Sequence, residues 1–277
     1  MCGRCDPLRI PWGALRREHT QALRAKLAER YEPAGANTRL SALRGVLKEA
    51  WLLGQMDAEL YHRAIEIKPV KGEKLPSGRH IRRRELQKLF NVCAKDERIA
   101  GRRDAAIIAV LYGGGLRRSE VVKLDRSDYD RDTGELRIRG GKGRRDRTAY
   151  AANGTVDALA EWLEVRGDDP GPLFWPSTGR GRPHTNGRMT GQAVMLLLRK
   201  RAAGAKIAPL TPHDFRRTFI GDLLDDGADM STVKDLAGHA NVNTTARYDR
   251  RGEETKRKAA QLLLVPFKKR AKESPVP

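Results

Sequence analysis

The sequence has little cysteine, few aromatic residues and no long apolar run, and each shortage excludes a class of protein. Three cysteines in 277 residues cannot build a disulfide framework, so we expect a reducing compartment. No stretch approaches the roughly 20 apolar residues that a membrane-spanning helix requires. Residues 1–11 lack the apolar core and the cleavage site of a secretory signal. Together these absences predict a cytoplasmic protein without a membrane segment.

A structural metal site is also not expected. Cys2 and Cys5 have the C-x-x-C spacing of many zinc ligands. A structural zinc ion needs about four ligands, and neither a second such pair nor a pair of histidines at ligand spacing follows. Chance spacing is therefore the favoured interpretation.

Negative charge is scarce relative to positive charge. The chain carries 55 Lys and Arg against 35 Asp and Glu, a formal net charge of +20. The excess is not confined to a tail, because residues 1–80 alone hold 15 basic and 9 acidic side chains. A surface that is positive over the whole chain predicts a polyanionic ligand, bound less tightly as salt rises. Duplex DNA fits this pattern, and at this level an RNA-binding or ribosomal protein fits equally well.

Residues 12–67 predict a small helical bundle with apolar positions at helical spacing. Pro33, followed by Ala and Gly, is expected to end the first helix, and Asn37 or Thr38 to cap the second. Asp57 is expected to cap a third helix. The composition then becomes rich in Pro, Gly, Lys and Ser over residues 68–80, which is typical of a linker.

The sequence therefore predicts two domains: residues 1–67 form a helical domain, residues 68–80 a linker, and residues 81–277 a second domain. Glycine-containing turns separate short strand-like segments in the second domain. These segments are residues 126–130, 135–139 and 145–150. Most of the remaining sequence has helical patterns, so the expected fold is mainly α with a small antiparallel β-sheet (α+β).

The segment beginning at Thr211 predicts a helix start that could bind a phosphate. Thr211 is expected at the N-cap, Pro212 at the first helical position and Asp214 near the third. His213 and Arg216 lie three residues apart, on one face of the first turn. Backbone N–H groups add positive potential there, which favours an anion. The alternative is an ordinary solvated basic helix start.

Three further positions could bring positive charge to a phosphate. Arg117 follows three glycines that let the backbone approach a ligand, although it could equally form a salt bridge to Glu120. Lys142 is expected at the tip of a hairpin, where it could donate a proton or simply be a solvated loop lysine. His239 follows a helix that Gly238 is expected to end with a left-handed cap.

Tyr248 follows His239 by nine residues, on an expected helix over residues 243–249. A lone tyrosine usually packs, but here it accompanies two arginines, two histidines and a lysine on loops or helix starts. This set fits phosphoryl transfer without a metal. Arginines and an imidazole can stabilise charge on the non-bridging oxygens, a tyrosine oxygen can attack, and a lysine can protonate the leaving oxygen.

The order and local context of these residues resemble the tyrosine recombinases, or phage integrases. The likeness runs from the linker to the end of the chain. The earlier helices, with the stretch Asn37-Thr-Arg-Leu-Ser-Ala-Leu-Arg, more loosely resemble the family's SAM-like core-binding domain. The resemblance implies that residues 1–67 are a core-binding domain and residues 81–277 a catalytic domain. It also implies site-specific cleavage and rejoining of double-stranded DNA through a Holliday junction, for integration or excision of a mobile element, without ATP or an essential metal.

The resemblance further implies a role for each candidate residue. His213 would act as base and hydrogen-bond donor, Lys142 would protonate the 5′ leaving oxygen, and Tyr248 would form a 3′-phosphotyrosyl bond. Three residues would hold the scissile phosphate: Arg117, Arg216 and His239.

In the family, four protomers encircle two DNA sites and a C-terminal helix of each docks into a neighbour. Residues 253–265 are the candidate for this exchange helix, and the alternative is that they pack on their own domain. The resemblance thus implies a homotetramer on DNA, a monomer free in solution and a role for an accessory DNA-bending protein. Because the helical domain begins close to Met1, we expect the family's first helix to be shortened or absent. Ala237 stands where the family often has leucine or another apolar residue before the Gly-His pair, a change expected to be harmless.

Two related functions remain open from the sequence. One is a catalytically silent relative that binds DNA, and the other is a nicking and closing enzyme like a type IB topoisomerase. The first is disfavoured because every expected catalytic position is filled. The second is disfavoured by the small size of the chain and by the candidate exchange helix.

Overall fold

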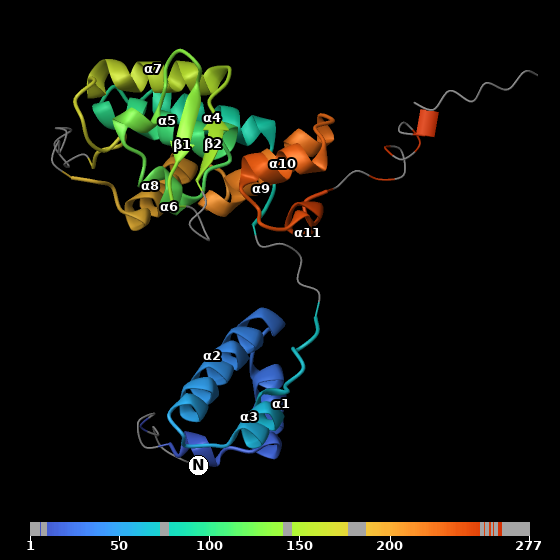
Figure 1. Ribbon diagram of the computed structural model, residues 1–277. Coiled ribbons are helices and arrows are strands. Elements are labelled where there is room, and N and C mark those ends of the chain that lie inside the picture. The colour runs from blue at the N-terminus through green and yellow to red at the C-terminus, as the bar shows by residue number, and fades with distance from the viewer. Residues whose placement is uncertain are drawn as a thin grey trace, which may run out of the picture. The chain divides into compact units, whose positions relative to one another are not determined.

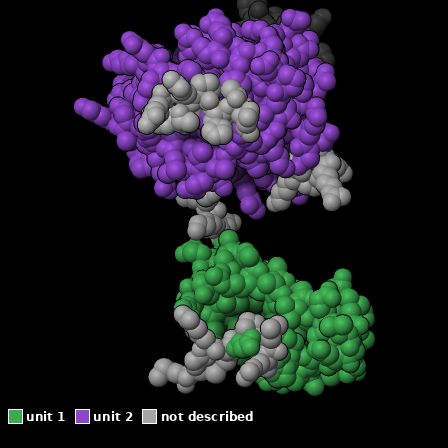
Figure 2. Space-filling model, turned by 90° about the vertical axis from the view of Figure 1, so that its left-hand side faces the viewer, with its two compact units in different colours: residues 1–75 green, residues 76–277 purple. Residues whose placement is uncertain are grey.

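The computed structural model describes residues 10–72, 78–140, 146–176 and 187–249, and a few single residues before and after them. The chain divides into two compact units, residues 1–75 and residues 76–277 (Figure 2). Cys2 and Cys5 lie outside the described residues. Within the described ranges, no helix is both long and apolar enough to cross a membrane.

The first unit is a helical bundle (Figure 1). Its elements are the 3-10 helix η2 (Trp12–Ala14) and the helices α1 (Arg17–Arg30), α2 (Pro33–Leu52) and α3 (Ala58–Ile65). The expected cap of α3 is confirmed, because Asp57 Oδ1 accepts a hydrogen bond of 2.8 Å from the Leu60 amide. Apolar side chains of α2 and α3 make most of the core, which consists of Leu40, Leu43, Leu47, Met56, Tyr61, Ala64 and Ile67.

The break between α1 and α2 differs from the prediction. Pro33 does not only end the previous helix but is the first residue of α2. Proline fits this position because an N–H group there would have no acceptor within the helix, and proline has no N–H group. Asn37 therefore lies inside α2 and does not cap it. Its side chain instead binds Val70, accepting from the amide at 2.8 Å and donating to the carbonyl at 3.0 Å. This contact fastens the start of the linker to the first unit.

The second unit is built around α5 (Ile99–Gly113), most of which is buried. Helices α4 (Arg83–Ala94), α7 (Gly154–Arg166) and α9 (Pro212–Asp225) pack against it. The remaining elements are α6 (Arg118–Val121), η3 (Arg126–Asp128), β1 (Glu135–Ile138), β2 (Arg147–Tyr150), α8 (Gly191–Gly204), α10 (Met230–Ala237) and α11 (Val242–Ala246). The prediction of a mainly α fold with a small antiparallel sheet is confirmed (Figure 1).

The described sheet has two strands. β1 and β2 pair antiparallel, with Glu135 opposite Tyr150 and Ile138 opposite Arg147. The strand expected at residues 126–130 is wrong for residues 126–128, which form η3, and only Tyr129 makes an isolated antiparallel bridge, to Leu136. Asp128 Oδ2 accepts a hydrogen bond of 3.0 Å from the Asp125 amide, and this local contact turns the chain into η3.

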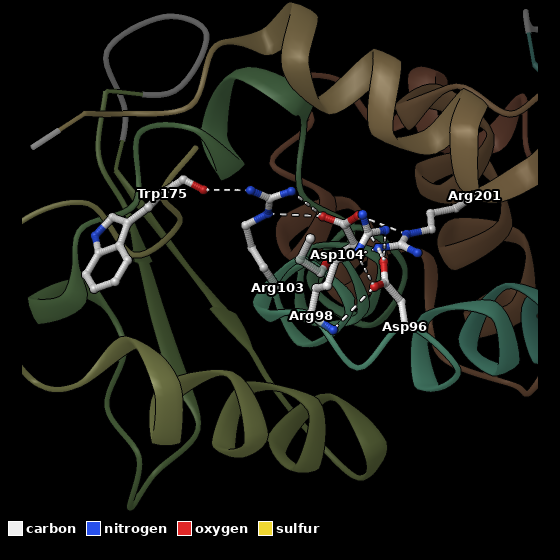
Figure 3. A network of polar contacts seen from close by, with 7 residues as sticks. Asp96, Arg98, Arg103, Asp104, Trp175 and Arg201 are labelled. Atoms are coloured by element: carbon white, nitrogen blue, oxygen red, sulfur yellow. Dashed lines mark hydrogen bonds and ion pairs between the residues drawn. The ribbon is translucent and has the colours of Figure 1, made fainter. Parts of the chain in front are cut away.

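A buried ionic network joins the α4–α5 turn to α8 (Figure 3). Arg201 of α8 donates to Asp104 Oδ2 at 2.9 Å and to Asp96 Oδ2 at 2.8 Å. Arg103 donates to the other Asp104 oxygen and to the Trp175 carbonyl at 3.0 Å. Buried charges that are paired in this way are costly to separate, on the order of 3–5 kcal/mol when one partner is removed. The network therefore fixes the scaffold that carries α5 and the glycine turn after it.

Candidate active site

The start of α9 has the predicted geometry. Thr211 is the N-cap, Pro212 is the first helical residue, and Asp214 Oδ2 accepts a hydrogen bond of 2.6 Å from the Thr211 amide. Arg216, one turn further on, is 4% exposed. Its Nη1 donates to the Gly115 carbonyl at 2.7 Å, and its Nη2 donates to the Ala237 carbonyl. This guanidinium thus joins the turn after α5 to the end of α10.

Arg117 forms the salt bridge to Glu120 that the sequence left open, and it also reaches the turn that ends α10. Its Nη1 donates to Glu120 Oε1 at 2.7 Å, and its Nη2 donates to the Gly238 carbonyl at 2.9 Å. Glu120 also accepts a hydrogen bond of 2.8 Å from Arg147 Nη2, while Arg147 Nη1 donates to the Leu236 carbonyl at 2.6 Å. One buried carboxylate therefore holds two guanidinium groups against the end of α10.

Arg147 is the site residue that the sequence analysis missed. It is the first residue of β2, and Ala149, two residues later, is buried. Because strand side chains alternate between faces, Arg147 shares the inner face with Ala149. A cation at an inward strand position is the signal that could have found it. Burial lowers the pKa of Arg147, which is partly offset by Glu120. Burial by itself would raise the pKa of Glu120, but Arg147 and Arg117 hold it below its usual value.

The predicted left-handed cap at Gly238 is confirmed, with φ 61° and ψ 47°. A side chain there would also collide with the site, because a Cβ atom would lie 2.6 Å from Arg147 Cδ. Glycine is thus required both by the backbone conformation and by the close approach of Arg147. The turn places His239 beside the arginines. His239 Nδ1 lies 2.8 Å from the hydroxyl of Thr245, which is fully buried.

His239 is neutral at pH 7. Burial, together with the nearby Arg216 and Arg117, lowers its pKa to about 4. If the Thr245 hydroxyl donates to Nδ1, the ring proton is on Nε2, which is then a donor for a phosphate oxygen. A neutral donor suits a site that already contains several guanidinium groups.

The lowered pKa of His239 predicts an acid-dependent loss of stability. In the unfolded chain, histidine takes up a proton near its ordinary pKa of 6.5, whereas the folded protein resists protonation until about pH 4. The unfolded state therefore binds more protons between these values, and stability falls as pH decreases from 6.5 to 4. We expect the thermal midpoint to fall less over this range in His239→Gln than in the wild type. The control is His62→Gln at an exposed position of α3, and identical pH profiles for wild type and His239→Gln would contradict the prediction.

Tyr248 lies in a turn two residues beyond α11, so the helix expected over residues 243–249 ends early, at Ala246. The Tyr248 hydroxyl is 3.4 Å from His213 Nε2. Its ring centroid lies 6.2 Å from that of His239 and 6.3 Å from that of His213. The phenol is thus placed between the two predicted histidines.

The described residues of the predicted site converge at the N-terminal part of α9. Lys142 lies outside the described residues. Burial, and next the neighbouring Arg117, lower the pKa of Arg216 to about 9. Arg117 and Arg147 are paired with the single carboxylate of Glu120, and Arg216 lies close enough to be affected by all three charges. A bound anion would therefore relieve the repulsion among the three guanidinium groups. A hollow of about 280 Å³ beside Arg117, His213 and Arg216 gives such an anion access.

The sequence and the fold were both compared with those of known proteins, and both comparisons agree with the resemblance seen in the sequence. The profile of the phage integrase family matches residues 79–254. The tyrosine recombinase XerA of Thermococcus kodakarensis is 30% identical over 253 residues, which cover 91% of this chain and 84% of the relative. The tyrosine recombinase XerC of Proteus mirabilis is 31% identical over 253 residues, covering 86% and 75%.

Solved structures with the same fold include XerH recombinase bound to its palindromic difH substrate after cleavage. Its TM-score is 0.65 at 21% identity, over 90% of this chain and 70% of that chain. The crystal structure of XerA recombinase has a TM-score of 0.54 at 23% identity, over 93% of this chain and 85% of that chain. At these identities, the likeness establishes a shared fold.

Proposed function

This chain belongs to the phage integrase family of tyrosine recombinases, and from that membership we propose that it cleaves and rejoins duplex DNA at a specific site through Tyr248. The observation that carries the proposal is the position of the Tyr248 hydroxyl, 3.4 Å from His213 Nε2 and near the buried Arg216. The curated relatives are named as tyrosine recombinases. The XerH structure has DNA bound, which agrees with a duplex as the substrate here.

In the proposed reaction, the Tyr248 oxygen attacks the scissile phosphorus and forms a 3′-phosphotyrosyl bond. His213 Nε2 accepts the phenolic proton, and Lys142 gives a proton to the departing 5′ oxygen. Arg117, Arg216 and the Nε2 proton of His239 bind the non-bridging oxygens and stabilise their charge. The 5′ hydroxyl of a partner duplex then attacks the phosphotyrosyl bond. This exchange restores Tyr248 and leads to a Holliday junction.

We assign a different function to each of the two units. We assign DNA core binding to the helical domain of residues 1–67 and catalysis to residues 81–277, with residues 68–80 as the linker. The positive charge of both parts supports DNA binding by each of them. We place the enzyme in the cytoplasm with its DNA substrate, and we assign it to integration or excision of a mobile element. An accessory DNA-bending protein would assist the assembly of two sites.

A groove of the second unit supports assembly into a tetramer on DNA. It has a volume of about 1210 Å³, and its lining comes from α4, α5, α7 and α9 and from the turns next to these helices. Although the chain has a net charge of +20, the lining includes Arg102 and seven carboxylates. One of them, Asp96, is already paired with Arg98 and Arg201. The other six acidic residues are Glu97, Asp157, Glu161, Glu164, Asp222 and Asp226.

The C-terminal sequence is opposite in charge to this groove. Residues 250–277 contain nine basic and three acidic residues around an apolar stretch at residues 262–265. Most of this segment lies outside the described residues. Within the expected exchange helix over residues 253–265, the described residues are Thr255, Arg257, Ala260 and Gln261, and these four are helical. The complementary charge and the apolar stretch lead us to assign the groove as the receptor for this segment of a neighbouring protomer. The free protein would then be a monomer and the DNA-bound form a tetramer.

Placing charge in the C-terminal apolar stretch should block this assembly. In the double variant Leu262→Asp and Leu263→Asp, we expect DNA binding to persist while the tetrameric complex is lost in analytical ultracentrifugation. The matched control is Leu52→Asp with Leu53→Asp, two adjacent leucines that are 59% and 71% exposed at the end of α2. A tetramer that forms normally in the C-terminal variant would overturn the receptor assignment.

The function itself is tested by covalent trapping. Wild-type protein is incubated, in EDTA, with nicked duplexes that tile the DNA flanking its gene, and products are separated on a denaturing gel. A protein–DNA adduct linked to the 3′ end is expected. Two further measurements separate the alternatives. Binding without an adduct would favour a silent relative, and relaxation of supercoils without joining of two duplexes would favour a topoisomerase-like enzyme.

A further inference from the structure

A four-residue segment at the start of the second unit, Gly78–Ile81, lies along the side of α9; we call it the strap. It contacts α9 at three positions four residues apart, which share one face of the helix. The Arg79 amide donates to Asp214 Oδ1 at 2.6 Å, and the Ile81 amide donates to Thr218 Oγ1 at 2.9 Å. His80 Nε2 lies 2.8 Å from Asp222 Oδ1.

The strap passes beside the ring of His213 at Gly78. A Cβ atom on Gly78 would lie 3.1 Å from His213 Cδ2 and 2.8 Å from Asp214 Oδ1. Gly78 also has a φ of +94°, which a residue with a side chain rarely adopts. Its carbonyl accepts a hydrogen bond of 2.8 Å from Arg217 Nη1. The backbone at Gly78 thus forms one wall of the space that holds the imidazole.

Asp214 connects the strap to the helix start that carries His213. One of its oxygens accepts from the Arg79 amide, and the other accepts from the amide and hydroxyl of Thr211, at 2.6 Å and 2.8 Å. Asp214 is 3% exposed, so water does not compete for these bonds. A shift of the strap would therefore move the residue next to His213, together with the cap of α9.

We propose that the strap is a positioning element for His213, with Gly78 and Asp214 as its positioning residues. The proposal rests on the proposed role of His213 beside Tyr248. With the strap in place, Nε2 faces the phenol, and the backbone at Gly78 limits rotation of the ring to that side. The strap also places the exit of the interdomain linker directly beside the proposed active site.

Gly78→Ala tests the proposal, with Gly227→Ala as its matched control. Gly227 has a φ of +97°, close to that of Gly78, but a Cβ there would meet nothing within 4 Å. In the wild-type protein, NMR should show a nuclear Overhauser effect between the Gly78 α protons and the His213 ring. We expect Gly78→Ala to shift the His213 ring resonances and to slow adduct formation at least about tenfold at unchanged DNA affinity. Gly227→Ala should do neither.

A substrate with a modified leaving group gives a second test of how Gly78→Ala slows adduct formation. A scissile phosphate with sulfur in place of the 5′ bridging oxygen has a leaving group that needs no proton donor. The defect of Lys142→Ala should be rescued by this substrate, whereas the defect of Gly78→Ala should persist because it lies on the nucleophile side. If Gly78→Ala does not fold, Asp214→Asn weakens the same contacts and should show the same pattern.

The outcomes separate this proposal from the proposed function. If the wild type forms no adduct, the function fails, but the NMR comparison still tests the contact between the strap and His213. If the wild type forms the adduct and Gly78→Ala matches Gly227→Ala in rate and in His213 resonances, the strap does not position His213. Rescue of Gly78→Ala by the sulfur substrate would likewise overturn the proposal.

Discussion

Replacing Tyr248 with phenylalanine is expected to abolish the covalent DNA adduct while DNA affinity stays within about twofold of wild type. The phenolic oxygen is the proposed nucleophile, and His213 Nε2 at 3.4 Å is its proposed proton acceptor. Without that oxygen, the bond to phosphorus cannot form, and loss of a nucleophile lowers the rate by roughly 10⁴-fold or more. The ring itself contributes packing between the two histidines, which phenylalanine preserves.

The measurement is the denaturing-gel assay on the nicked duplex that traps the wild type, with DNA affinity followed separately by fluorescence anisotropy. Tyr150→Phe is the matched control, because Tyr150 is 49% exposed on β2 and has no proposed part in the chemistry. It should form the adduct at the wild-type rate. An adduct formed by Tyr248→Phe would show that another residue attacks the phosphorus.

Local rules predicted the helix ends that build the site. Thr211, Pro212 and Asp214 form the expected helix start, and Gly238 has the expected left-handed conformation. Such features depend on hydrogen bonds within a few residues, so the sequence contains the whole cause. The same rules placed a strand at residues 126–130. They did not anticipate the hydrogen bond from the Asp125 amide to the Asp128 side chain, which accompanies the short helix η3.

Contacts between distant segments were not predictable in this way. Glu120 and Arg147 are 27 residues apart, and Arg216 reaches the carbonyl of Gly115 across 101 residues. No local pattern specifies which cation meets which carboxylate in a chain with 55 Lys and Arg. The strap was missed for the same reason, since Gly78 was interpreted as part of a linker and its contact with His213 depends on the packing of α9.

Arg216→Ala is expected to slow adduct formation by a factor equivalent to about 3–5 kcal/mol, comparable with removing a preorganised donor from other active sites. Arg216 is held on both sides by backbone carbonyls, so its charge is fixed before DNA arrives. A fixed cation next to the phosphate need not reorganise as charge develops on the non-bridging oxygens. Arg216→Lys should recover only part of the rate, because an ammonium cannot reproduce the planar fork of donors.

A loss of rate could also arise from the two carbonyls that Arg216→Ala leaves without their donor, since unsatisfied buried groups cost about 1–3 kcal/mol each in stability. The thermal midpoint of each variant is therefore measured beside the single-turnover cleavage rate. Added guanidinium at millimolar concentration should restore part of the cleavage rate of Arg216→Ala, because it returns the cation to the space that the side chain left. No such recovery is expected for Tyr248→Phe. If Arg216→Ala cleaves at nearly the wild-type rate, the phosphate is held by other groups, and Arg216 serves only to join Gly115 to the end of α10.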